Sequence, residues 1–475
     1  MHENTTIRKK IMARNRIIYQ SKALFIAPSA TGAQIALTGC NTAAAVKTTG
    51  APYAPGDLTS NAIANSTGLL VKLDRVQNLN FGFTINAQDV NEMGRLARIN
   101  RISNEPPTVN LDYSYYVTDG LTERLMGFVF GGTEASKAGA PAFDSDMPVG
   151  AGALSGFLEE TQGQNYYIIT TNEGEDVVGA TLSTEDSTVS IGNGFVSNYE
   201  LNLTVGELPT ANVTVEGFNI KCDTSGTNAK SGISPGINTL ADPNVAFTAA
   251  DLNRYYVIQD SLISATAGTG YNNIAALRPG DITVATDAFS AEDDEFITLA
   301  SDKASTAHIQ SLSFSLPLAR TTLSRLGAFF GYNRVIDVPL NMEISLSVFA
   351  TEFNANKNLF NVLCGSQPER QFTVTLNKCN DDGSHTPAIR YQFKGAILLS
   401  ENHSLDIGGN ETVDLTYSIQ IGGANDTTRG LFMSGSYTAD QNPFLDAQYP
   451  DFGGDGTGLS GLIKNFYGPG VRRNY

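Results

Sequence analysis

The 475-residue chain has no tryptophan, four cysteines, four histidines and few charged residues. Charged residues make up 17% of the sequence, whereas about a quarter is usual for a soluble domain. Basic residues are the scarcer kind, since 31 Lys and Arg stand against 48 Asp and Glu and give a formal net charge of -17. Strong binding to phosphates needs clustered positive charge. The composition therefore excludes a protein that binds DNA phosphates by charge alone.

The four cysteines stand at positions 40, 222, 364 and 379, and no two of them form a CxxC pair. Four in this length are not a disulfide framework, so we expect thiols, with Cys364 and Cys379 as the pair most able to contradict this. No run reaches the roughly 18 apolar residues of a membrane helix. The basic residues near the start are not followed by the apolar stretch of a secretion signal. We expect no membrane partner and no secretion.

Motifs for catalysis and for cofactor or metal binding are missing. The histidines show no HxxxH or HExxH spacing, and neither a GxSxG nor a GxxxxGK[ST] loop occurs. Residues 456–461 fit GxGxxG formally, but no strand precedes them and no βαβ unit follows, so we interpret them as a loop. The acidic run 292–295 lacks the alternating ligands of a calcium loop. The sequence predicts no catalytic residue, no cofactor and no metal, and an enzyme has no support.

Glycine is abundant, with 46 residues, and together with Ser, Thr and Asn it is typical of many turns and short strands. The chain also repeats itself, because six markers recur in the same order in both halves. The matched segments are 15–16 with 253–254, 55–59 with 279–283, 76–81 with 309–314, 100–101 with 333–334, 179–182 with 395–398, and 190–192 with 406–408. Six collinear matches predict a tandem duplication.

The duplication divides the chain into five segments. The first copy is predicted to run from 15 to 220 and the second from 252 to 436. Between them, residues 221–251 are small, polar and Gly-rich, which is typical of a linker. Residues 1–14 and 437–475 fall outside the repeat and are predicted to be N-terminal and C-terminal arms.

Alternation of apolar and polar residues with a period of two predicts three strands in each copy. The predicted strands are 78–85, 109–116 and 198–205 in the first copy, and 311–318, 342–348 and 414–421 in the second. One short helix per copy should follow the second strand, at 121–130 and at about 354–363. The predicted fold class is therefore mainly β, with two tandem β-sandwich or half-barrel domains, each with one short flanking α-helix.

The polar faces of these strands contain no Lys and no Arg. An ordinary solvated face uses Lys freely, because its long stem covers apolar surface. Either something specific passes over these faces, or the deficit is a chance feature of a Lys-poor chain. The candidate residues are Asn78, Asn80, Asp112, Ser114, Asn198, Glu200, Ser313, Glu343, Ser345, Asp414 and Thr416.

Long connections follow the first strand of each copy, at 87–107 and 320–338. Connections of this length are usually functional or disordered. The first holds Arg95, Arg98 and Arg101, and the second keeps only the counterpart of the last, Arg334. These arginines form either a solvated face or a contact with an acidic neighbouring subunit.

Segments 76–99 and 106–116, beginning Val-Gln-Asn-Leu-Asn-Phe and Pro-Pro-Thr-Val-Asn-Leu, resemble the tail tube proteins of tailed bacteriophages. Residues 395–400 and 407–415 resemble the closing strands of the same fold. The resemblance covers roughly three quarters of the chain and implies tail-tube-like domains. In that family six domains form a ring, and rings stack into a tube through which the genome leaves the capsid.

Two copies in one chain then imply a trimer with pseudo-sixfold symmetry. The resemblance implies that the polar faces line the lumen, and that 87–107 docks on the adjacent ring through Arg95 and Arg98. In the second copy Phe329, Phe330 and Tyr332 would make this contact. The expected partners are further copies of the chain, other tail proteins and duplex DNA in transit.

The expected location is the virion, as part of a phage tail assembled in the host cytoplasm. Two other classes stay open at this point: a baseplate hub or other tail protein, and a tandem β-sandwich adhesin or capsid decoration protein. The second class gives no reason for strand faces without basic residues.

Overall fold

The structure is a computed structural model, and everything said of it concerns the residues that it describes. These are 19–28, 70–73, 75–103, 107–118, 120–128, 153–154, 164–170, 187–223, 258–259, 276–286, 297–298, 308–323, 326, 333–349, 352–353, 369–379, 383, 385–405, 407, 409–423, 426 and 428–435. Both predicted arms and the predicted helix at 354–363 lie outside the described residues. Of the predicted linker, only residues 221–223 are described, and they belong to a strand.

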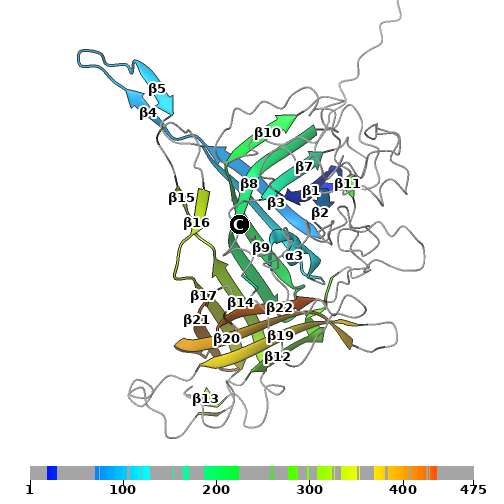
Figure 1. The fold of residues 1–475 in the computed structure, drawn as a ribbon. Coiled ribbons are helices and arrows are strands. Elements are labelled where there is room, and N and C mark those ends of the chain that lie inside the picture. The colour runs from blue at the N-terminus through cyan, green and yellow to red at the C-terminus, as the bar shows by residue number, and fades with distance from the viewer. Residues whose placement is uncertain are drawn as a thin grey trace, which may run out of the picture.

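The described part is mainly β, as the alternation predicted (Figure 1). The first copy contains β1 (Lys22–Pro28), β2 (Leu70–Lys72), β3 (Val76–Thr84), β4 (Ala87–Val90), β5 (Asn100–Ser103), β6 (Thr108–Tyr116), β7 (Gln164–Thr170), β8 (Ser187–Thr204), β9 (Thr210–Gly217) and β10 (Asn219–Asp223). The flanking helix predicted at 121–130 is present as α3 (Leu121–Met126).

The second copy repeats this order. It contains β12 (Ile282–Thr286), β14 (Ile309–Pro317), β15 (Arg320–Leu323), β16 (Asn333–Ile336), β17 (Asn341–Phe349), β19 (Arg370–Cys379), β20 (His385–Ser404), β21 (Thr412–Gln420) and β22 (Gly430–Gly435). The short elements η1 (Tyr19–Ser21), β11 (Ile258–Gln259), η5 (Pro279–Asp281), β13 (Ile297–Thr298) and β18 (Glu352–Phe353) complete the described part.

Each copy is a two-layered half-barrel built on one long strand. The first half of β8 pairs with β7 and β10, and its second half pairs with β9, which pairs in turn with β6 and then β3. In the second copy β20 pairs in the same way with β19, β22 and β21. Gly194 lies where β8 passes from its pairing with β7 to its pairing with β9. A Cβ there would lie 2.7 Å from Val215 Cγ1, so a larger residue would force a shift. In both copies, the side chains on one side of each layer are buried against the other layer, as the period-two pattern predicts.

The strands of the two copies join edge to edge in one sheet. Residues 198–204 of β8 pair antiparallel with β14, which pairs with β17. One of the two layers is thus a continuous run of eight strands in the order β3, β6, β9, β8, β14, β17, β21, β20. The sequence repeat gave no sign of this junction, because edge-to-edge pairing leaves no local periodicity.

The strand equivalences correct several of the sequence matches. A constant spacing of 233 residues (309 minus 76) carries β3 onto β14, β4 and β5 onto β15 and β16, and β6 onto β17, as predicted. Beyond these, β9 corresponds to β21 and the second half of β8 to that of β20, with β-bulges at residues 197 and 399. The matches of 179–182 with 395–398, of 190–192 with 406–408 and of 198–205 with 414–421 were therefore wrong. The match of 55–59 with 279–283 was also wrong, because β12 pairs with β19 as β1 pairs with β7. The alternation of β21 is the same as that of β8, so the pattern alone could not tell the two strands apart.

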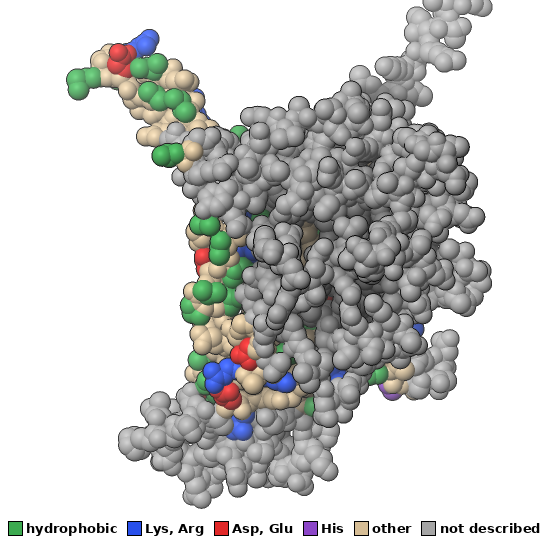
Figure 2. Space-filling model, viewed as in Figure 1, with side chains coloured by type: hydrophobic (Ala, Val, Ile, Leu, Met, Phe, Trp, Pro, Cys, Tyr) green, Lys and Arg blue, Asp and Glu red, His purple; other side chains and the backbone are tan. Residues whose placement is uncertain are grey.

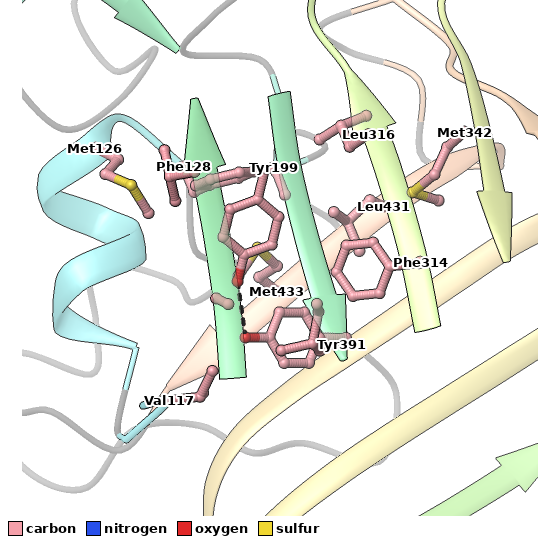
Figure 3. Close-up of a cluster of buried hydrophobic side chains, with 14 of the residues drawn as sticks. Val117, Met126, Phe128, Tyr199, Phe314, Leu316, Met342, Tyr391, Leu431 and Met433 are labelled. Carbon is pink, nitrogen blue, oxygen red and sulfur yellow. Dashed lines mark hydrogen bonds between the residues drawn. The ribbon is translucent and has the colours of Figure 1, made fainter. Parts of the chain in front are cut away.

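One buried cluster lies between the layers and extends across both copies. Figure 3 shows Val117, Phe128 and Tyr199 from the first copy packed with Phe314 and Tyr391 from the second. The ring centroids of Phe128 and Tyr199 are 4.9 Å apart, and those of Phe314 and Tyr391 are 5.6 Å apart. The two copies therefore share one buried core.

Candidate functional site: a polar sheet face, two open edges and a projecting hairpin

All eleven predicted polar-face residues lie on one face of the eight-stranded layer. On β6 and β17 the same alternation recurs, with every second residue fully buried and the residues between them exposed or half-buried. The buried partners include Leu111 and Tyr113 on β6 and Ile344 and Leu346 on β17. Because alternate side chains on a strand point to opposite faces, burial of one set fixes the other set on the outer face.

Strand register joins these side chains into rows that cross both copies. One row contains Asn78, Ser114, Asn212, Glu200, Ser315, Glu343 and Ser418. A second contains Asn202, Ser313, Ser345, Thr416 and Ser400. Asp112 lies between Asn80 and Thr214, and Asp414 between Ser347 and Asn402. Across the described strands of this face, from β3 to β21, no Lys or Arg interrupts the rows.

Sequence reasoning missed one strand of this face. β9 carries Thr210, Asn212, Thr214 and Glu216 on the polar side, with Ala211 and its alternate neighbours buried. The signal was present, because 210–217 alternates with a period of two. On β8, Asn202 Nδ2 donates a hydrogen bond of 3.1 Å to Glu200 Oε1, so these polar groups partly satisfy one another.

Within the described ranges, both ends of the eight-stranded layer are open edges. β3 pairs with β6 on one side, and residues 398–404 of β20 pair with β21 on one side. Among the described residues nothing pairs with the other side of either segment. By contrast, residues 198–204 of β8, the counterpart of the β20 segment, pair on both sides. An unpaired strand edge is a template for another strand.

The connection 87–107 is a two-stranded hairpin of β4 and β5 that projects from the body (Figure 1). Its predicted contact residues already have acidic neighbours within it. Arg98 Nη1 is 3.1 Å from Asp89 Oδ1, Arg101 Nε is 3.7 Å from the same atom, and Arg95 Nη1 is 4.0 Å from Glu92 Oε2. All these side chains are well exposed, so each pair contributes little to stability.

Exposed apolar side chains on the hairpin were not predicted. Figure 2 shows hydrophobic surface over much of the projection. The residues and their exposed fractions are Val90 39%, Met93 101%, Leu96 109%, Ile99 49% and Ile102 49%. Exposed apolar groups gathered on one projection are typical of a contact surface.

In the second copy, the corresponding hairpin is formed by β15 and β16, and its base packs against the first copy. Arg334 lies on the first copy, with its guanidinium 4.3 Å from the Phe218 ring centroid and Nη1 3.3 Å from Glu216 Oε2. Burial lowers the pKa of Arg334 from its ordinary value, and the Glu216 carboxylate acts in the opposite direction. Its predicted contact residues Phe329, Phe330 and Tyr332 lie outside the described residues.

The described residues include two of the four cysteines. Cys222 and Cys379 carry thiols, and Cys40 and Cys364 lie outside the described residues. Within the described ranges, no group of three His, Cys, Asp or Glu side chains could hold a metal ion. No helix in the described part is long and apolar enough to span a membrane.

No family model and no curated protein matches the chain. Among solved structures, it is similar to a chain of the anti-feeding prophage baseplate, determined by cryo-EM with 6-fold symmetry, with 12% identity and a TM-score of 0.21 over 32% of this chain and 91% of that one. It is also similar to an Hcp protein, with 10% identity and a TM-score of 0.19 over 33% of this chain and 98% of that one. Since both TM-scores are far below 0.5, we base the functional proposal on the sheet's own faces and edges.

Proposed function

We propose that three copies of this chain close into a ring, and that rings stack into a tail tube through which duplex DNA passes. The chain would thus be a structural protein of a phage virion, assembled in the host cytoplasm. The observation that carries the proposal is an eight-stranded layer with an open edge at each end and a polar face without basic residues. Ring closure would pair both edges.

The junction inside the chain supplies the template for the junction between chains. There, β14 pairs with residues 198–204 of β8. Replacing β14 by its counterpart β3, and β8 by its counterpart β20, brings the open edge of one chain onto the open edge of the next. The transferred register pairs Leu79 with Leu405, Asn80 with Ser404, Phe81 with His403, Gly82 with Asn402, Phe83 with Glu401 and Thr84 with Ser400.

This register continues both faces of the sheet. Asn80, Gly82 and Thr84 meet Ser404, Asn402 and Ser400, so the polar rows extend from one chain to the next. On the other side, Phe81 and Phe83 are 37% and 58% exposed in the single chain. Pairing would cover these rings, and burial of apolar area of this kind stabilises association.

The dimensions suit a conduit for DNA. Three chains would supply 24 strands to the inner wall. At about 4.8 Å between strands and a tilt of about 40°, such a barrel is roughly 45–50 Å across between opposite backbones. Side chains of modest length, such as Asn, Ser and Thr, leave a wide passage inside that diameter.

The chemistry of the polar face suits sliding rather than binding. Every Lys or Arg that contacts a phosphate releases counterions and adds affinity. Rows of Asn, Ser and Thr with scattered carboxylates such as Asp112 and Glu343 add none. An adhesin or decoration protein has no such requirement, which is why we favour the tube over that class.

Electron microscopy and native mass spectrometry of the purified protein test the proposal. We expect assemblies of three chains, and hollow polymers of stacked rings at high concentration. Discrete rings that never stack would favour a baseplate hub or another tail component. Monomers at all concentrations, or rings of six chains with twelve repeat domains, would contradict the proposal.

A further inference from the structure

The chemistry of the open edge on β20 differs from that of its counterpart inside the chain. On β8, two of the core-side residues beside β14 are Tyr199 and Leu201, and both are fully buried. The equivalent core-side residues of β20 are Glu401, which lies opposite Leu415, and His403, which lies opposite Val413. The β8–β14 junction inside the chain is thus lined by Tyr199 and Leu201, whereas the equivalent positions at the open edge of β20 carry ionisable side chains.

These side chains form a compact acid–histidine cluster with Glu411. His403 Nε2 is 3.2 Å from Glu401 Oε1, and His403 Nδ1 is 3.4 Å from Glu411 Oε1. The exposed fractions of the side chains are 7% for Glu401, 33% for His403 and 25% for Glu411. The cluster therefore holds two carboxyl groups against one imidazole, which is an excess of acidic groups. Partial burial makes a nearby cation more favourable than it would be in open water.

The opposite edge of the chain presents a cation on the same side of the sheet. Lys22 on β1 places Nζ 5.2 Å from the centroid of the Phe81 ring. Phe81 is a core-side residue of β3, since it lies opposite Leu111. Its counterpart inside the chain, Phe314, is buried and packs on Tyr199, with 5.8 Å between ring centroids. Lys22 therefore lies beside the Phe81 side chain, which the next chain would cover in the proposed trimer.

We propose that chains are joined in the ring by an ionic seam, in which Lys22 of one chain meets the Glu401–His403–Glu411 cluster of the next. This inference rests on the proposed ring, because the register that places Phe81 beside His403 is the one transferred from the internal junction. Charge complementarity identifies a second copy of this chain as the partner. The seam inside the chain is apolar and permanent, whereas the seam between chains depends on ionic strength.

Charge reversal tests the seam. In Lys22→Glu, a third carboxylate replaces the cation, so we expect the trimer to dissociate at a protein concentration about tenfold or more above that of the unmodified chain. Glu411→Lys should weaken the trimer in the same way. The double variant Lys22→Glu with Glu411→Lys should regain most of the lost affinity. Lys378→Glu on β19, away from both open edges, is the matched control for the change in net charge and should leave the trimer intact.

Native mass spectrometry of each variant, with sedimentation at low and high salt, gives the trimer fraction, and thermal unfolding of the monomer shows that each variant folds. Rescue in the double variant and weakening of the unmodified trimer by salt support the seam. If the unmodified chain forms trimers and Lys22→Glu forms them equally well, the ionic seam is wrong and the ring stands. If the unmodified chain forms no trimer under any condition, the ring and the seam both fail.

Discussion

The hydroxyl groups of Tyr199 and Tyr391 lie 3.3 Å apart in the core, although the two residues belong to different copies of the repeat (Figure 3). Both also reach Glu123 Oε1 on α3, at 3.3 and 3.4 Å, and Tyr115 donates a hydrogen bond of 2.8 Å to the same atom. Glu123 is only 1% exposed. One buried carboxylate therefore ties its own copy to the next one.

Replacing this carboxylate should destabilise the chain as a whole. In Glu123→Gln, the three hydroxyl groups that contact Oε1 lose a charged acceptor and keep at most a neutral amide oxygen in its place. We expect the free energy of unfolding to fall by about 1–3 kcal/mol. Chemical denaturation followed by circular dichroism measures this. Glu207→Gln, in the exposed turn after β8, is the matched control and should change stability by less than about 0.5 kcal/mol.

The same cluster predicts a loss of stability in alkali. Burial raises the pKa of Tyr115, Tyr199 and Tyr391 above the ordinary value, which is about 10. The folded state then holds these protons more tightly than the unfolded state does. Their contribution is fully present below about pH 10 and is lost as the pH rises further. The melting temperature should fall steeply above that pH, and more gently in Tyr199→Phe with Tyr391→Phe; equal slopes would refute the assignment.

Adding positive charge to the polar face should make the tube retain DNA. Asp112→Lys with Glu343→Lys places two cations per chain on exposed positions of that face. Because each phosphate contact adds affinity, we expect salt-sensitive DNA retention in assembled tubes and slower ejection from particles. Assembly itself should be unchanged. Glu207→Lys with Glu369→Lys makes the same charge change away from the face; if it retained DNA equally, the polar face would not be the channel wall.

The β4–β5 hairpin should act in stacking and not in ring closure. Met93→Asp with Leu96→Asp removes its two most exposed apolar side chains, and we expect trimers to form while tubes stay short or absent. Arg95→Glu with Arg98→Glu should have the same effect if these residues also meet carboxylates of the next ring. Tube length, measured by electron microscopy, shows whether stacking needs the apolar residues, the arginines or both. Tubes of normal length in both double variants would end the docking hypothesis.

The sequence predicted the strands that alternate cleanly and failed where alternation gave no distinction. β3, β6 and their counterparts were located with the correct spacing, because Leu111, Tyr113 and their alternate neighbours mark a buried side. The second half of β20 was missed, since Glu401 and His403 occupy core-side positions and break the pattern. Period-two patterns resemble one another, so β21 was matched to β8 instead of β9.

The polar face of the candidate site could be predicted from the sequence, but the open strand edges could not. Polar residues such as Asn80 and Ser345 could be assigned to one face from alternation alone, and the register places them on it. The open edges depend on which strands pair, and pairing between β8 and β14 is a long-range contact without a local signal. The partners of Arg98 and Arg101 also became visible only when the hairpin brought Asp89 beside them.

A designed disulfide tests the closure of the ring most directly. The transferred register pairs Asn80 of one chain with Ser404 of the next on the exposed polar face, and directly opposed residues in antiparallel strands lie within the span of a disulfide. We predict that Asn80→Cys with Ser404→Cys, after mild oxidation, yields a covalent species of three chains on a non-reducing gel, while each single variant yields none. A double variant that stays monomeric on that gel although trimers form, or one that gives a covalent ladder up to six chains, would contradict the account.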